Sequence, residues 1–231
     1  MAIRPIFSPL LGEYSGVKEQ MMEFKWHSGM AVIQKKKNIA ELHSTAKVHG
    51  FKKILEISSK SEQNLGIKLS AFNLCITTRK KGAIFTVETA FQGSKVFENG
   101  GPYTDLIGMD SRAAKKDMRL KQSGNLIGFK FFGKKFPNKP RTFFYDWLYI
   151  NALIQNEDLA SAVLEYEGFS DIEFNPKKSI NCQAYAVALY VSLQKNNHLK
   201  FALNSPDNFL KATEKQYQDQ LRNIQIQSTL I

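Results

Sequence analysis

The chain has 231 residues, two cysteines, four histidines and a formal net charge of +11. This length allows one large domain with a sizeable core, whereas so few cysteines and histidines exclude a disulfide framework and a cysteine-based zinc site. No signal-peptide pattern and no run of about 18 apolar residues occurs. We therefore expect a cytoplasmic protein with no metal, no other cofactor and no membrane partner.

The predicted elements give a helix-rich α+β fold in a single domain. Apolar spacing and capping residues predict helices at 28–50, 86–99, 110–122, 141–154, 157–167 and 182–193, and a last one that begins at 205–207 and carries Leu210, Tyr217, Leu221 and Ile224 on one side. Alternation and turn residues predict a strand at 53–58, a loop ending at Gly66, a hairpin of 69–78 and 82–87 joined by the basic turn 79–82, and extended pieces within 124–142. We expect an N-terminal extension at 1–27, a main domain at 28–200 and a C-terminal helical extension at 201–231.

Positive charge is concentrated in the middle of the chain. Residues 61–150 carry a net charge of +8, whereas residues 151–231 carry −2. Within residues 112–141, ten basic residues accompany Asp117 as the single acidic one. Such a field attracts polyanions, so this segment indicates contact with nucleic acid or with a nucleotide; the alternative is a solvated lysine-rich surface. The candidates for phosphate contact are Arg112, Lys115, Lys116, Arg119 and Lys130.

An ordered series of segments resembles the NADAR, or YbiA-like, family. LSAFN (69–73) is similar to the family's G-x-x-SNF, with Asn73 one position beyond Phe72, and TVETAFQGSKVF (86–97) is similar to its VE-x-x-FQ-x-x-K helix. Further similar segments follow in order: AKKDMR (114–119), ALIQNEDLASAVLEY (152–166) and SINCQAYAVALYVSL (179–193). The resemblance runs from residue 54 to 194 and implies a NADAR-like fold with N-glycosidase activity.

Three segments resemble one branch of that family more closely. They are EISSKS (56–61), AFQGSKVFENGGPYTDL (90–106) and YDWLYINAL (145–153). Members of this branch are paired with DarT-type DNA ADP-ribosyltransferase toxins and act as their antitoxins. The resemblance implies ADP-ribosylated DNA as the substrate, removal of ADP-ribose from guanine as the reaction, and a DarT-like toxin as a further partner.

Two residues of the 86–97 segment are the catalytic candidates. Cleavage of an N-glycosidic bond needs a proton for the leaving amine, so a carboxyl group is the usual acid/base, and the resemblance assigns this role to Glu88. The alternative is that Glu88 only stabilises the first turn of its helix. Lys95 stands about 10 Å further along the predicted helix. It either attracts the pyrophosphate, attacks an opened ribose to form a Schiff base, or is simply solvated.

The candidates for substrate binding lie around the predicted hairpin and on later helices. Loop hydroxyls suit phosphate contact and Phe72 suits base stacking, with turn formation and core packing as alternatives. Gln92 binds ribose hydroxyls or faces water, and Asn181 caps the 182–193 helix or contacts the ligand. Trp147 stacks on the ligand beside Asp146 or packs in the core. The full set is Ser58, Ser59, Ser70, Phe72, Asn73, Phe91, Gln92, Asp146, Trp147 and Asn181.

The leading hypothesis is an N-glycosidase, a hydrolase that removes ADP-ribose from guanine in DNA. One alternative is a YbiA-like N-glycosidase that acts on a ribosylamino intermediate of riboflavin synthesis. The other is a module without catalytic activity that sequesters ADP-ribose or the toxin.

Overall fold

The computed structural model describes residues 1–78 and 82–219. Its largest sheet contains four strands in the order β2 (Gly16–Phe24), β1 (Ala2–Leu10), β9 (Gly168–Ser170) and β3 (Ile54–Glu56). Strands β1 and β2 form a long antiparallel hairpin, and β9 runs antiparallel to β1 and parallel to β3. This hairpin is not among the elements predicted from the sequence, because the prolines of β1 weaken the strand signal.

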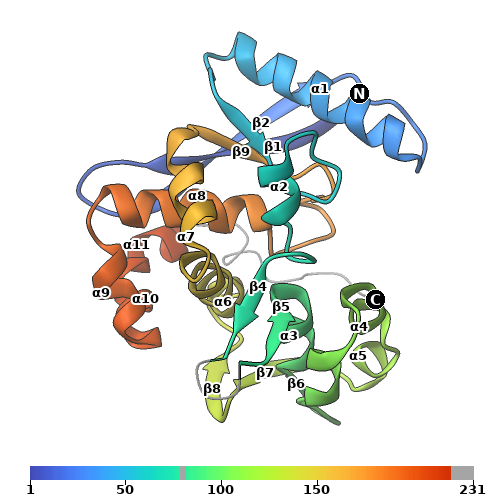
Figure 1. Cartoon of the computed structure of the whole chain (residues 1–231), viewed down its shortest axis with the longest axis vertical. Helices are drawn as coiled ribbons and strands as arrows, with labels where there is room; N and C mark the ends of the chain where they lie inside the picture. Colours follow the sequence, from blue (N-terminus) through green and yellow to red (C-terminus); the bar gives the residue numbers. More distant parts are fainter. Residues whose placement is uncertain (79–81, 220–231) are drawn as a thin grey trace.

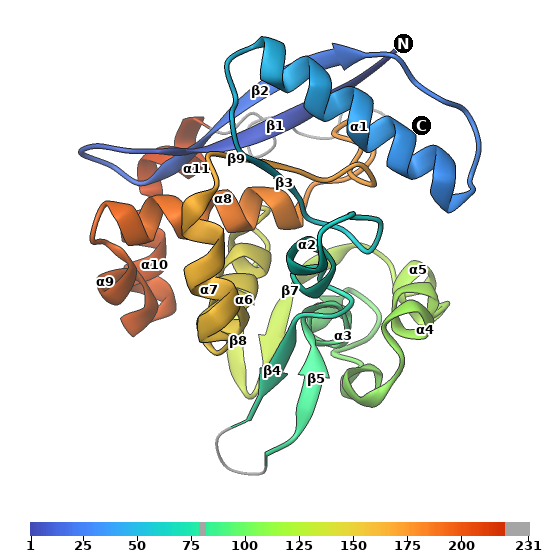
Figure 2. The ribbon, with the colours of Figure 1, turned by 45° about the horizontal axis from the view of Figure 1, so that its top comes forward.

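Helices cover both faces of this sheet. Helix α1 (Val32–Val48) packs on one face and α8 (Gln183–Lys195) on the other, as Figures 1 and 2 show. Successive side chains of β1 therefore enter different clusters: Ile6 packs in the cluster that contains Leu42 of α1, whereas Phe7 contacts Tyr185 of α8 with ring centroids 5.9 Å apart. This division follows from the two-residue period of a strand.

Two small sheets lie at the opposite end of the molecule (Figure 1). One pairs β4 (Cys75–Thr77) with β5 (Ile84–Thr86); the other has the order β6 (Lys95–Phe97), β7 (Leu126–Phe131), β8 (Lys134–Pro137). Helix α6 (Phe143–Ile154) supports this end through aromatic contacts, among them Phe129 with Phe144 at 4.6 Å between centroids. The predicted hairpin around 79–82 is thus shorter than expected, and residues 79–81 lie outside the described residues.

The other helices complete a helix-rich α+β domain, so the predicted fold class is confirmed. They are α2 (Asn64–Lys68), α3 (Val87–Gly93), α4 (Ser111–Lys116), α5 (Arg119–Gln122), α7 (Glu157–Ala162), α9 (Leu199–Asn204), α10 (Pro206–Ala212), α11 (Glu214–Asp219) and 3-10 turns at Thr104–Gly108 and Val163–Glu165. Phe209 and Tyr217 of the C-terminal helices belong to the main core, as does Phe7 of β1. Leu221 and Ile224 lie outside the described residues.

The helix predicted at 86–99 is wrong in its second half. Helix α3 ends at Gly93, and residues 95–97 instead form β6, which pairs with β7. The chain must pass close to its neighbours here, because a Cβ on Gly93 would lie 2.8 Å from the Ile107 side chain. Pairing with a distant strand therefore outweighs local helix propensity, and Lys95 is not on the helix that carries Glu88.

Other predicted boundaries also change. The basic helix at 110–122 is split into α4 and α5, because the Asp117 carboxylate accepts a hydrogen bond from the Arg119 backbone and starts a new turn. The loop ending at Gly66 contains the start of α2, and the helix predicted at 157–167 ends at Ala162 and is followed by the 3-10 turn Val163–Glu165. Within the described part of the chain, no helix has the length and apolar character required to cross a membrane.

Candidate active site

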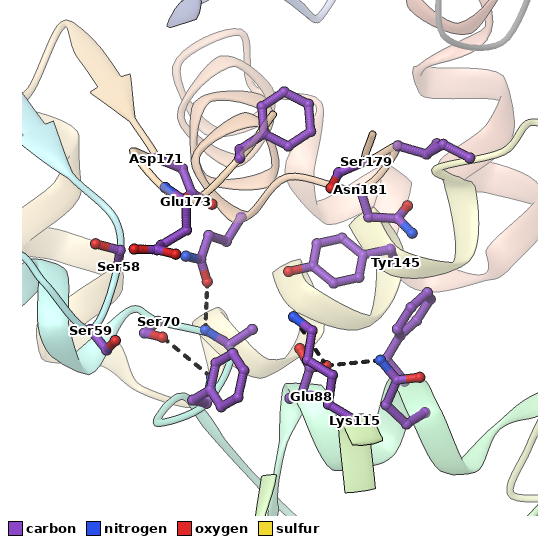
Figure 3. A pocket seen from close by; sticks show the side chains of 17 residues that line it. Ser58, Ser59, Ser70, Glu88, Lys115, Tyr145, Asp171, Glu173, Ser179 and Asn181 are labelled. Carbon is purple, nitrogen blue, oxygen red and sulfur yellow. Dashed lines mark hydrogen bonds and ion pairs between the residues drawn. The ribbon is translucent and has the colours of Figure 1, made fainter. Parts of the chain in front are cut away.

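An open pocket of about 290 Å³ lies between the two ends of the molecule. Figure 3 shows Glu88 of α3 and Lys115 of α4 on one wall, Ser58, Asp171 and Glu173 on another, and the Tyr145 hydroxyl directed into the space between them. The pocket is lined by Ser58, Ser59, Ser70, Ala71, Phe72, Glu88, Phe91, Gln92, Lys115, Tyr145, Asp171, Glu173, Phe174, Ser179, Ile180, Asn181 and Gln183. Segments distant in the sequence therefore meet at one polar cavity.

Glu88 is the buried carboxylate at the centre of this site. The Thr86 hydroxyl caps α3 by accepting from the Thr89 backbone, which places Glu88 in the first turn. The residue is 5% exposed, and its Oε1 accepts a hydrogen bond from Gln92 Nε2 at 2.8 Å. Lys115 Nζ lies 3.8 Å from the same oxygen. Glu88 thus has one neutral and one positive neighbour, a setting in which a carboxyl group can exchange a proton with a ligand.

Two amide oxygens at the pocket lack a hydrogen-bond partner among the residues that the structure describes. They are Oε1 of Gln92 and Oδ1 of Asn181, and both atoms are buried. Leaving a buried polar atom unpaired typically costs about 1–3 kcal/mol. Because both side chains line the cavity, a ligand with hydroxyl or amino donors would satisfy them.

The two lysines near Glu88 differ from the predicted arrangement. Lys95 lies on β6 rather than on the Glu88 helix, and its Nζ sits 4.8 Å from the centre of the Phe91 ring. Burial lowers the pKa of Lys95 to about 8, partly opposed by Glu88 and assisted by Lys115. Lys115, which the sequence analysis assigned to phosphate contact, is the lysine that lines the pocket, with its Nζ 5.0 Å from the Phe72 ring centre.

Several pocket residues were missed by the sequence analysis, and Gln183 is the most informative. Its Oε1 accepts from the Ala71 backbone at 2.8 Å, and its Nε2 donates to the Ile57 carbonyl. One side chain of α8 therefore ties together the two loops that carry Ser58 and Ser70. The only sequence signal was its position two residues after Asn181. Tyr145 was also missed, although its immediate neighbour Asp146 was a candidate. Burial is the main cause that raises the pKa of Tyr145, and the charge of Glu88 is the second.

A buried polar network supports the wall that carries Ser58. Glu56 is 1% exposed and accepts hydrogen bonds from Ser170 Oγ and from the Ile172 backbone. His43 Nε2 lies 2.8 Å from Ser170 Oγ, and burial lowers the pKa of His43 to about 4. Burial raises the pKa of Glu56, and burial together with Glu56 raises that of Asp171. Burial in this network thus favours the neutral form of each of these groups relative to the same group in water.

Three predicted substrate-binding residues lie outside the pocket. Asn73 is exposed and donates to the Ile67 carbonyl. Asp146 is fully buried and accepts from the Tyr217 hydroxyl at 3.0 Å, so it joins α6 to α11. The Trp147 ring packs 5.0 Å from Phe136, which is the core alternative considered for it. Residues adjacent on a helix point in different directions, so proximity in sequence to Tyr145 did not bring either side chain into the cavity.

The basic residues are dispersed by the fold. Arg119 forms ion pairs with Asp105 at 2.6 Å and with Asp117 at 2.9 Å, so much of its charge is neutralised within the protein. Arg112 and Lys116 are exposed on α4, and Lys130 is exposed on β7. Only Lys115 of these five belongs to the pocket lining. The described ranges also contain no group of three or more histidine, cysteine or acidic side chains arranged to bind a metal ion.

The fold and the site define an α+β protein with a polar, ligand-sized pocket built around a buried glutamate. The model of the DarT1-associated NADAR antitoxin family matches residues 2–223, and the chain belongs to this family. The match confirms the family branch recognised from the sequence, and members of the NADAR family are generally N-glycosidases. No curated protein matches the chain.

Proposed function

We propose that this protein is an N-glycosidase that hydrolyses the bond between ADP-ribose and guanine in DNA, and that this activity is the basis of its antitoxin role. The observation that carries the proposal is the placement of Glu88, buried in a polar pocket between Gln92 and Lys115. Membership of the DarT1-associated antitoxin family supports the identity of the toxin partner and, through it, of the substrate.

In the proposed reaction, the bond between the anomeric carbon of ribose and the guanine amino nitrogen breaks. Glu88 transfers a proton to the leaving nitrogen while positive charge develops on the sugar. A water molecule then adds to the anomeric carbon and returns a proton to the Glu88 carboxylate, which balances the reaction. Gln92 orients the Glu88 carboxyl group, and its Oε1, which has no partner among the described residues, accepts a hydrogen bond from a ribose hydroxyl in this proposal.

A lysine could contribute by contacting the substrate or by forming a Schiff base, and we assign both roles to Lys115 rather than to Lys95. Lys115 lines the pocket beside Glu88, so it is the lysine placed to contact the sugar or the pyrophosphate directly. Lys95 contacts the Phe91 ring instead, and burial is the main cause of its lowered pKa. Lys115 is therefore the residue that contacts the ligand, and it is also the amine to test for a Schiff base with an opened ribose.

The test is incubation of the protein with guanine-ADP-ribosylated DNA, with release of ADP-ribose as the readout. We expect the wild type to release ADP-ribose and Glu88→Gln to be slower by a factor of about 100 or more, the usual effect of losing a general acid. Glu62→Gln, which removes an exposed carboxylate outside the pocket lining, is the matched control and should retain activity. Tight binding without release would support a sequestering module instead. Hydrolysis only of a free ribosylamino pyrimidine would support the riboflavin-related alternative.

A further inference from the structure

The turn between β7 and β8 presents an unusual residue at its tip. Phe131 pairs with Lys134, so Phe132 and Gly133 form a two-residue turn. Both have positive φ, +44° at Phe132 and +81° at Gly133. Such turns favour Asn-Gly, because a bulky side chain is strained in the left-handed region. Here the strained position holds a phenylalanine that is 67% exposed. Neither local backbone preference nor burial explains this choice.

The same hairpin carries a cluster of three lysines. Lys130 and Lys135 are paired directly across β7 and β8, and Lys134 follows the turn. All three side chains are exposed, and none forms an ion pair with an acidic group of the described ranges. Like charges directly opposite each other destabilise a hairpin. The arrangement therefore becomes favourable when a polyanion lies along these lysines.

The hairpin is joined rigidly to the wall of the pocket. The Lys130 backbone donates to the Ser94 carbonyl at 2.7 Å, directly after α3. The Phe129 ring lies 5.5 Å from the ring of Phe91, which lines the pocket. The Phe132 ring itself is held by Phe131 and Phe85, at 4.6 Å and 6.0 Å between centroids. An exposed aromatic ring is thus fixed in place on an element continuous with the site.

We propose that the β7–β8 hairpin is a second DNA-contacting surface, on which Phe132 stacks against an unpaired base while Lys130, Lys134 and Lys135 contact the flanking phosphates. Base stacking on an aromatic side chain beside a basic groove is how proteins hold single-stranded DNA without reading its sequence. The inference rests on the proposed DNA substrate and extends it: the hairpin binds the strand outside the modified nucleotide.

The experiment measures the affinity of the full-length protein for an unmodified single-stranded oligonucleotide, which does not depend on catalysis. We expect Phe132→Ala to weaken binding by roughly tenfold, the effect of losing one stacked base, and Phe132→Trp to retain the wild-type affinity. Phe201→Ala removes an exposed phenylalanine from α9 and is the matched control, with unchanged affinity expected. Phe132→Asn should bind weakly and yet melt at no lower temperature than the wild type, because asparagine suits this turn.

Three results would overturn the inference. The first is wild-type affinity of Phe132→Ala for the oligonucleotide. The second is a lower melting temperature of Phe132→Asn, which would show that the ring serves to cover Phe85. The third is reduced binding of Phe132→Ala to phosphatidylserine vesicles while its binding to DNA is unchanged. The proposed function is checked separately by hydrolysis of free ADP-ribosyl guanosine, which Phe132→Ala should cleave at the wild-type rate. Failure of the wild type to cleave that compound while Phe132 still governs oligonucleotide affinity would contradict the glycosidase and leave the DNA surface supported.

Discussion

The pocket and the β7–β8 hairpin use charge in opposite ways. In the pocket, Glu88 and Asp171 are buried, and Glu88 lies between the amide of Gln92 and the ammonium group of Lys115. On the hairpin, Lys130 and Lys135 are exposed, unpaired with acidic groups of the described residues, and repel each other. A preorganised cavity suits chemistry on one small group, whereas an exposed basic ridge suits a long flexible polyanion. The comparison shows how one chain can separate the two tasks.

The largest expected effect tests how rigidly the pocket is built. Gln183→Leu leaves the Ala71 amide and the Ile57 carbonyl buried without their partner, which should lower the free energy of unfolding by about 3 kcal/mol. Gln194→Leu, at an exposed position of the same helix, should change stability by less than about 0.5 kcal/mol. Urea denaturation of both variants measures the difference, and equal stabilities would show that Gln183 does not hold the two loops together.

The next effect tests whether Lys115 acts on the ligand within the pocket or only as one of the positive charges of the basic segment 112–141. Lys115→Gln should reduce kcat/KM for ADP-ribosyl guanosine by about 100-fold, because it removes the positive group beside Glu88. Its neighbour Lys116, exposed on α4 and absent from the pocket lining, is the control, and Lys116→Gln should retain nearly full activity on this small substrate. Similar losses in both variants would mean that Lys115 acts only through the general positive field.

A smaller effect concerns the network that supports the Ser58 wall. The pKa of His43 is lowered to about 4 in the folded protein, so its neutral form is favoured there. The contribution of neutral His43 to the free energy of unfolding is fully present above the unfolded pKa of about 6.5, and it is lost as pH falls toward 4. His43→Gln should therefore lose less stability than the wild type between pH 7 and pH 4, by about 2 kcal/mol after allowance for partial exposure. Denaturation across this range measures the difference, and parallel pH profiles would contradict the prediction.

The smallest effect distinguishes two kinds of basic residue in the segment 112–141: those without an ion pair among the described residues and those paired with an aspartate. Lys130→Gln should reduce the slope of log affinity for DNA against log salt by about 1, because one phosphate contact is lost. Arg119→Gln should change this slope less, since Arg119 is already paired with Asp105 and Asp117. Binding titrations between low and physiological ionic strength measure both slopes. An absence of any salt dependence in the wild type would remove the case for DNA contact through the basic segment.

The candidate site shows which residues a sequence pattern can locate. Glu88 and Gln92 are a helical turn apart, and this local spacing was enough to place both on one face of α3. Lys95 was placed on the same helix, but the pairing of β6 with β7 moved it to a strand. Tyr145 and Asp171 could not be found in this way, because they reach the pocket from elements that are distant in the sequence.

Patterns within the sequence were sufficient to predict the family, the helix-rich α+β class, the glutamate that lies in the pocket and the positive charge of the middle segment. Composition and local spacing carry these properties, because they depend on residues close together in the chain. The distribution of that charge became visible in the fold: Lys115 lines the pocket, Arg119 is paired with two aspartates, and Lys130 is exposed opposite Lys135. The placement of these basic residues depends on long-range strand pairing and burial, which local sequence patterns do not predict.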